Sequence, residues 1–166
     1  MKRLIAALAA ATLLCSPCMA QEVARVHATD LNGRDVELPA HLPADRTLLL
    51  IAFRHADQTI VQGWKEGLGL KVDGDWLEIP VIGVGSSIIH GMIRSGMRSK
   101  YPDQQARAHV VPMFGDADAL ARGFGVSPDT ITALVVDRSG HVLARATGPF
   151  EASGAAGIRR AWRSPS

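Results

Sequence analysis

The sequence predicts an α/β fold, a three-layer α/β/α sandwich that begins with a β-hairpin. Three runs, at 47–53, 79–84 and 132–136, are almost continuously apolar, which is typical of strands covered on both faces. Segments with apolar residues at helical spacing lie between these runs. Because helices that connect neighbouring strands cross over a sheet, this alternation predicts a parallel core with right-handed connections. A turn at 137–140 adds an antiparallel edge.

Length and composition limit the possible classes of protein. The chain has 166 residues, enough for one ordinary domain, and 47% hydrophobic with 20% charged residues is typical of globular proteins. Aromatic residues make up 5%, which provides few surfaces for stacking nucleic-acid bases. The two cysteines exclude a disulfide-dense scaffold and a zinc site made of four thiolates.

The first twenty residues have the pattern of a secretory signal peptide. Met1-Lys2-Arg3 is a short basic start, an apolar run follows at 4–14, and small residues precede a cleavage site near Ala20. The run is shorter than the ~20 residues that a transmembrane helix needs. We therefore expect a signal peptide over 1–20, a single domain over 21–166, and a periplasmic or secreted protein.

Cleavage changes the chemistry of the remaining chain. Removing Lys2 and Arg3 from the 18 basic residues leaves 16, equal to the 16 acidic residues, so the mature net charge is zero. Nothing then steers the domain toward nucleic acid or anionic lipid, and we expect no stable membrane insertion. Cys15 and Cys18 are removed too, so the mature domain contains no thiol. Its expected partner is an unidentified protein or small molecule of the periplasm, with no cofactor.

The first half of the mature chain predicts a hairpin and a βα unit. A strand at 23–31, a two-residue turn at Asn32-Gly33 and a return strand at 35–38 form the hairpin. After the apolar run at 47–53, Asp57 is a candidate N-cap of a helix. The apolar stripe of this helix consists of Ile60, Val61, Trp64 and Leu68.

The second half continues the alternation. Ser86 or Ser87 caps a helix that ends at Tyr101-Pro102. We expect its stripe to face the core: Ile88, Ile89, Met92, Ile93 and Gly96. Residues 109–113 form an edge strand, since Pro112 cannot donate to a sheet. The remaining elements are a helix capped by Asp116, strands at 132–136 and 141–146, and a helix at 150–163.

The late strand and its turn resemble the thioredoxin-like superfamily, in its peroxiredoxin and TlpA-like forms. The best match is the segment 132–142, in which a hydrophobic strand ends in Asp-x-x-Gly, and Phe124-Gly125-Val126 resembles the approach to that strand. The resemblance covers about residues 22–163. The first part of the chain, with Arg54 and Trp64 after the central strand, also resembles the mitochondrial ATP synthase assembly factors of this superfamily, which lack a fixed redox pair.

The resemblance implies a scaffold without the chemistry of the family. Family members place a reactive cysteine after the central strand, at a helix N-terminus that lowers its pKa. Here the segment 53–60 contains no cysteine, and Ile131 stands near the place of the family's cis-proline. Thiol exchange requires an attacking sulfur, so we expect neither oxidoreductase nor peroxidase activity. The leading hypothesis is a binding or assembly module that is not an enzyme.

Four polar residues mark the candidate binding site: Arg54, His55, Asp57 and Gln58. They follow the central strand, and open α/β sheets bind ligands at the carboxyl ends of their strands. In one interpretation His55 next to Asp57 serves as a proton shuttle in a cysteine-independent enzyme, or forms an anion site with Arg54. In the other, this segment is a solvated loop and Asp57 caps the helix. We assign no catalytic residue.

A third hypothesis is a copper protein. His90, Met92 and Met97 offer the imidazole and thioether ligands that suit Cu(I). Helical geometry brings His90 and Met97 close together, whereas Met92 points nearly opposite and belongs to the predicted core stripe. We assign no metal ligand.

Overall fold

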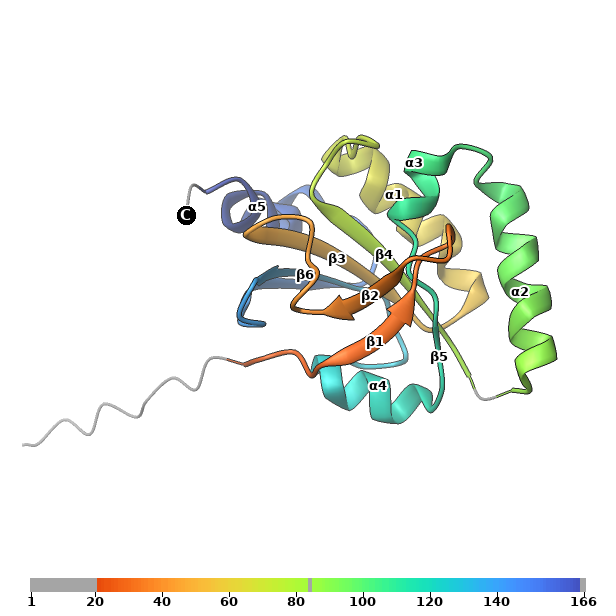
Figure 1. Cartoon of the computed structure of the whole chain (residues 1–166). Coiled ribbons are helices and arrows are strands. Elements are labelled where there is room, and N and C mark those ends of the chain that lie inside the picture. Colours follow the sequence, from red (N-terminus) through yellow and green to blue (C-terminus); the bar gives the residue numbers. More distant parts are fainter. Residues whose placement is uncertain (1–20, 84, 165–166) are drawn as a thin grey trace, which may run out of the picture.

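The computed structural model describes residues 21–83 and 85–164, so the predicted signal peptide lies outside the described residues. A five-stranded sheet in the order β5-β4-β3-β6-β7 forms the centre of the molecule (Figure 1). Its strands are β3 (Arg46–Ala52), β4 (Trp76–Ile82), β5 (Met113–Phe114), β6 (Thr132–Asp137) and β7 (Val142–Thr147). β3, β4 and β5 are parallel, as expected. β6 pairs with β3 in the antiparallel direction, and β7 with β6, so the predicted parallel core does not include the apolar run at 132–136.

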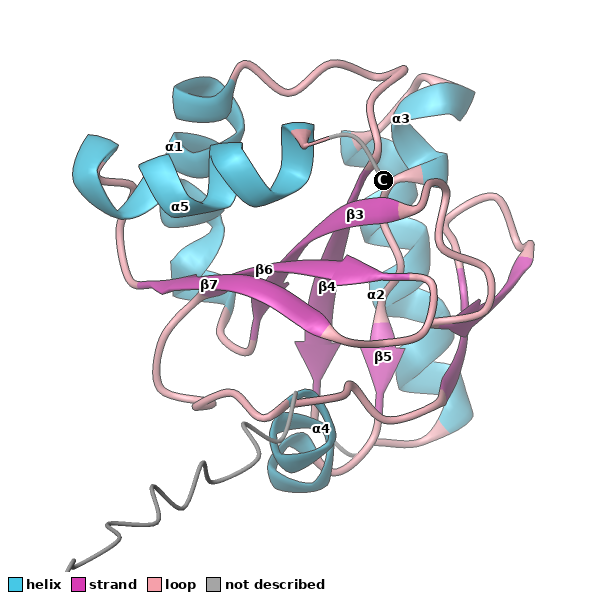
Figure 2. Ribbon diagram, turned by 90° about the vertical axis from the view of Figure 1, so that its left-hand side faces the viewer, coloured by secondary structure: helices cyan, strands magenta, loops and turns pink. Residues whose placement is uncertain are grey.

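Helices and a hairpin cover the two faces of the sheet. The helical elements are the 3₁₀ turn η1 (His55–Asp57), α1 (Gln58–Leu68), α2 (Ser87–Lys100), α3 (Gln104–Ala108), α4 (Ala117–Phe124) and α5 (Ala152–Arg163). Figure 2 shows α1 and α5 on one face and α4 on the other. The hairpin of β1 (Val26–Thr29) and β2 (Asp35–Leu38) packs with α4, so the predicted three-layer fold with an N-terminal hairpin is confirmed.

Two hydrophobic clusters follow from the alternation of side chains along the strands. Leu49 and Ile51 of β3 join the cluster under the hairpin and α4, while Leu48 and Leu50 join the cluster under α1 and α5. All four side chains are fully buried. The apolar run therefore forms a central strand covered on both faces, as its sequence predicts.

The turn of the β1–β2 hairpin differs from the predicted one. Pairing ends at Thr29 and Asp35, so five residues form the connection instead of the two at Asn32-Gly33. The buried carboxylate of Asp30 accepts hydrogen bonds from the backbone N–H groups of Asn32 and Arg34, at 2.8 and 2.9 Å. Gly33 has a φ of 87°, which explains the glycine. The side chain of Asp30 thus organises a wider turn.

The segment before β5 also differs. Residues 104–108 form the short helix α3, and the strand predicted at 109–113 is replaced by a single bridge from Val110 to Glu78 and by β5. The edge position is correct. His109 is buried, stacks on Trp76 with ring centroids 4.3 Å apart, and contacts the carbonyl oxygens of Trp76 and Val72 with its two ring nitrogens. His109 is therefore structural.

The predicted burial of α2 is wrong. Ser86 caps the helix as expected, but none of the fourteen residues of α2 is buried. Ile88 is 75% exposed, Ile89 51% and Met92 71%. In Figure 1 the helix lies at the edge of the molecule, beyond the two-residue edge strand β5. The sheet therefore offers no surface against which the apolar stripe of α2 can pack.

Among the described residues, no helix has both the length and the apolar composition required to cross a membrane.

A candidate ligand cleft between two helices

A cleft opens at the carboxyl ends of β3 and β4, between the start of α1 and the second half of α2. Its volume is about 120 Å³. Eleven residues line it: Ala52, Arg54, His55, Gln58, Pro80, Val81, Ile82, Ile93, Met97, Lys100 and Tyr101. Ligands of open α/β sheets favour this position because loops after adjacent parallel strands meet there.

An ion pair shapes the loop after β3. The guanidinium of Arg54 donates from Nε and Nη2 to the two carboxylate oxygens of Asp57, at 3.2 and 3.0 Å. Asp57 is 2% exposed, and its hydrogen bonds and charge raise the pKa of Arg54. Asp57 occupies the N-cap position of α1, but its side chain makes no capping hydrogen bond. The predicted N-cap position is therefore correct, but the carboxylate of Asp57 binds Arg54 instead of capping the helix.

The other predicted site residues divide between the cleft and the protein interior. His55 is exposed and Gln58 is half-buried, and both line the cleft together with Arg54. Asp57 is not a lining residue. Among the described residues, His55 forms no hydrogen bond with Asp57, whose oxygens are held by Arg54. The fold thus brings three of the four predicted residues to one cleft and places Asp57 behind Arg54.

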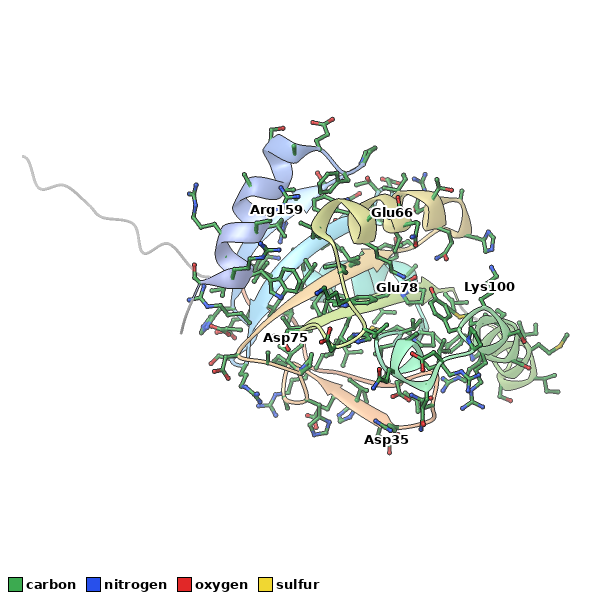
Figure 3. The ribbon with its side chains drawn as sticks, turned by 90° about the horizontal axis from the view of Figure 1, so that it is seen from above. Asp35, Glu66, Asp75, Glu78, Lys100 and Arg159 are labelled. Atoms are coloured by element: carbon green, nitrogen blue, oxygen red, sulfur yellow. The ribbon has the colours of Figure 1, made fainter. Side chains whose placement is uncertain are left out.

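The opposite side of the cleft comes from α2 and was not predicted from the sequence. Ile93 and Met97 are half-buried residues of the inward side of this helix, and Lys100 and Tyr101 lie at its end. Figure 3 shows Lys100 on the side of α2 that faces α1. The sequence offers no local signal for this wall, because residues 93–101 reach the cleft only through the path that α2 takes after β4.

A buried polar network adjoins the cleft. The Tyr101 hydroxyl donates to Glu78 Oε2 at 3.1 Å, and the ammonium of Lys65 donates to the same oxygen. Lys65 Nζ also lies 5.3 Å from the Trp76 ring centroid and 5.4 Å from that of Tyr101. Burial raises the pKa of Tyr101, and the negative charge of Glu78 raises it further. Tyr101 therefore connects the cleft to the interior (Figure 3, Glu78).

The residues of the copper hypothesis are separated in the fold. The His90 ring stacks on Phe114 with centroids 4.3 Å apart, and Met97 lines the cleft. Met92 points outward at 71% exposure. Within the described ranges 21–83 and 85–164, there is no group of three histidine, cysteine, aspartate or glutamate residues arranged to hold a metal ion.

Comparison with solved structures gives the class of the fold. The structure resembles a putative electron transport protein from Aquifex aeolicus, with a TM-score of 0.60 and 14% identity, covering 87% of this chain and 96% of that one. A putative thioredoxin from Neisseria meningitidis matches with a TM-score of 0.55 and 17% identity over 87% and 91% of the two chains. The exposed lipoprotein thioredoxin of Streptococcus pneumoniae matches with a TM-score of 0.54 and 13% identity over 81% and 97%.

No protein-family model matches the chain, and no curated protein is similar to it in sequence. At these identities the structural likeness establishes the fold alone. The molecule therefore has a thioredoxin-like fold. Its particular feature is the segment after the central strand, Phe53-Arg54-His55-Ala56-Asp57. This segment contains an Arg–Asp ion pair and a histidine but no cysteine. The cis peptide of the described chain joins Leu38 to Pro39, whereas Ile131 precedes β6.

Proposed function

We propose that this protein is an exported binding module of thioredoxin-like fold without thiol redox activity, and that it takes its ligand in the cleft between α1 and α2. One observation carries the proposal. The segment after β3 lines a cleft at the carboxyl ends of two parallel strands. This segment contributes the polar groups of Arg54, His55 and Gln58 to the cleft. These groups bind and orient a ligand, but they supply no sulfur nucleophile.

The distribution of cysteines supports the same proposal. Both cysteines, Cys15 and Cys18, precede residue 21, and none of the residues that line the cleft is a cysteine. If the first twenty residues are a signal peptide, export removes both. An acid–base enzyme that uses His55 and Asp57 is less well supported, since Arg54 occupies both carboxylate oxygens of Asp57.

The redox part of the proposal is tested by insulin reduction with dithiothreitol. We expect the purified protein to show the rate of the buffer alone, and the Cys15→Ser/Cys18→Ser double variant to show the same rate. Catalysed reduction by the wild type that the double variant loses would overturn the claim that the module lacks thiol activity.

The binding part is tested by screening a library of small organic fragments with backbone amide NMR. We expect some fragments to shift the amide resonances of Gln58, Ile93 and Met97, which line the cleft. Met97→Trp fills the cleft and should abolish these shifts, while Leu143→Trp adds the same bulk to the exposed strand β7 and should retain them. A screen in which no fragment perturbs the cleft would refute ligand binding there.

A further inference from the structure

We infer that the cleft binds a small monocarboxylate whose apolar chain has about five carbon atoms beyond the carboxylate, a size that follows from the cleft volume. This inference rests on the proposed function and names the chemical class of its ligand. Two properties of the lining residues carry it, namely the sign of the charge at the rim and the apolar character of the interior.

The rim is basic on both sides. Arg54 and His55 come from the loop after β3, Lys100 comes from the end of α2, and no acidic side chain lines the cleft. Within the described part of the chain, Lys100 forms no ion pair. A ligand anion placed between these groups gains attraction from two elements and meets no like charge on the lining.

Arg54 retains donors for such an anion. Asp57 accepts from Nε and Nη2, and Nη1 donates to no other described residue. Because Asp57 fixes the guanidinium plane, the Nη1 hydrogens are held in place before a ligand arrives. The paired carboxylate thus positions Arg54, and it lowers the net charge of the rim by one.

The interior of the cleft is apolar. Ala52 and Pro80 come from β3 and β4, and Ile93 and Met97 come from the inward side of α2. The volume of about 120 Å³ is somewhat smaller than that of an apolar cavity that accommodates benzene, about 150 Å³. A short aliphatic chain therefore fits this space while its carboxylate stays at the basic rim.

Other ligand classes fit less well. An inorganic anion leaves the apolar interior unfilled, and an ammonium group finds no carboxylate on the lining. Two buried acids lie close to lining residues in the sequence, and neither lines the cleft itself. Arg54 binds both carboxylate oxygens of Asp57. Lys65 and Tyr101 bind Oε2 of Glu78. The matching chemistry occurs in two sources, a free fatty acid and the C-terminal residue of a peptide that ends in an aliphatic side chain.

The test measures dissociation constants by NMR titration of the purified protein with hexanoate, hexanol, hexylamine and acetate. We expect hexanoate to bind about tenfold more tightly than hexanol, since hydrogen bonds to a charged group add about this factor. A short peptide that ends in leucine is compared with its C-terminal amide. Tighter binding of the free acid of this peptide than of hexanoate identifies a peptide source, and the reverse order identifies a fatty acid.

Two matched variants assign the charge. Lys100→Met keeps the length of the side chain and should weaken hexanoate binding severalfold with hexanol unchanged, because the charge–charge attraction is lost. Lys71→Met, on an exposed loop, should change neither. Equal or tighter binding of hexanol or hexylamine overturns the carboxylate assignment but leaves the binding function in place. If none of the titrated compounds binds, the result overturns the binding function itself.

Discussion

The helices α1 and α2 carry similar apolar stripes and occupy opposite kinds of environment. In α1, Val61, Trp64 and Leu68 are buried against the sheet, with Trp64 at 1% exposure. In α2, Ile88 and Met92 are more than two-thirds exposed. An apolar stripe therefore makes a helix amphipathic, but it becomes buried only where another element offers a surface against which it can pack.

The sheet explains which helix receives such a surface. Under α1, β3 and β4 present Leu50, Ala52 and Trp76 from long neighbouring strands. Beyond β4 the sheet continues only as β5, which has two residues. α2 therefore contacts the body of the protein through its inward side, where Arg94 lies 5.4 Å from the Phe114 ring and Arg98 donates to the carbonyl oxygen of Leu31.

The largest effect in this comparison is expected from Trp64→Ala. The substitution removes a fully buried side chain that donates to the Gly148 carbonyl at 2.9 Å and packs edge-on against Phe150. Emptying such a site costs about 3–5 kcal/mol of unfolding free energy, measured by urea denaturation. Trp162→Ala, at a half-buried tryptophan of α5, is the control and should cost clearly less. Equal losses would contradict the deeper burial of Trp64 in α1.

An intermediate effect is expected at Tyr101, the single tyrosine of the chain, where α2 ends beside the core. The raised pKa means that the fold favours the neutral phenol. Its stabilising contribution is complete below the ordinary value of 10 and declines as the pH rises above it. Phenolate absorbance should therefore appear above pH 10 in the native protein, and stability should fall more steeply there than in Tyr101→Phe. If the Tyr101 hydroxyl ionised with its ordinary pKa of 10, this result would contradict the buried contact with Glu78.

The smallest effect is expected on the outward side of α2. Ile88→Ser and Met92→Ser exchange exposed apolar side chains for polar ones, and each should change the unfolding free energy by no more than about 0.5 kcal/mol. Urea denaturation measures the unfolding free energies of these two variants and of Trp64→Ala, and so compares the contributions of the two helices to stability. A loss approaching that of Trp64→Ala would mean that this side of α2 is covered in solution.

The sequence predicted where the candidate site lies, but not all the residues that form it. The position of Arg54, His55 and Gln58 after a continuous apolar strand indicated that they meet at the carboxyl end of the sheet. Nothing local showed that Arg54 binds the Asp57 carboxylate from three residues away, so the cap interpretation was equally consistent with the spacing. Lys100 and Tyr101 stand more than forty residues further along, and only the crossover of α2 brings them to the same cleft.

By itself, the sequence determined the thioredoxin-like order of strands and helices and the absence of cysteine after residue 20. These follow from hydrophobic periodicity and residue identity, which are local properties of a chain. The exposed stripe of α2, by contrast, follows only from the tertiary structure. The tertiary structure also decided that a basic rim surrounds an apolar cleft. Each of these depends on which surface another element offers, and no local pattern records that.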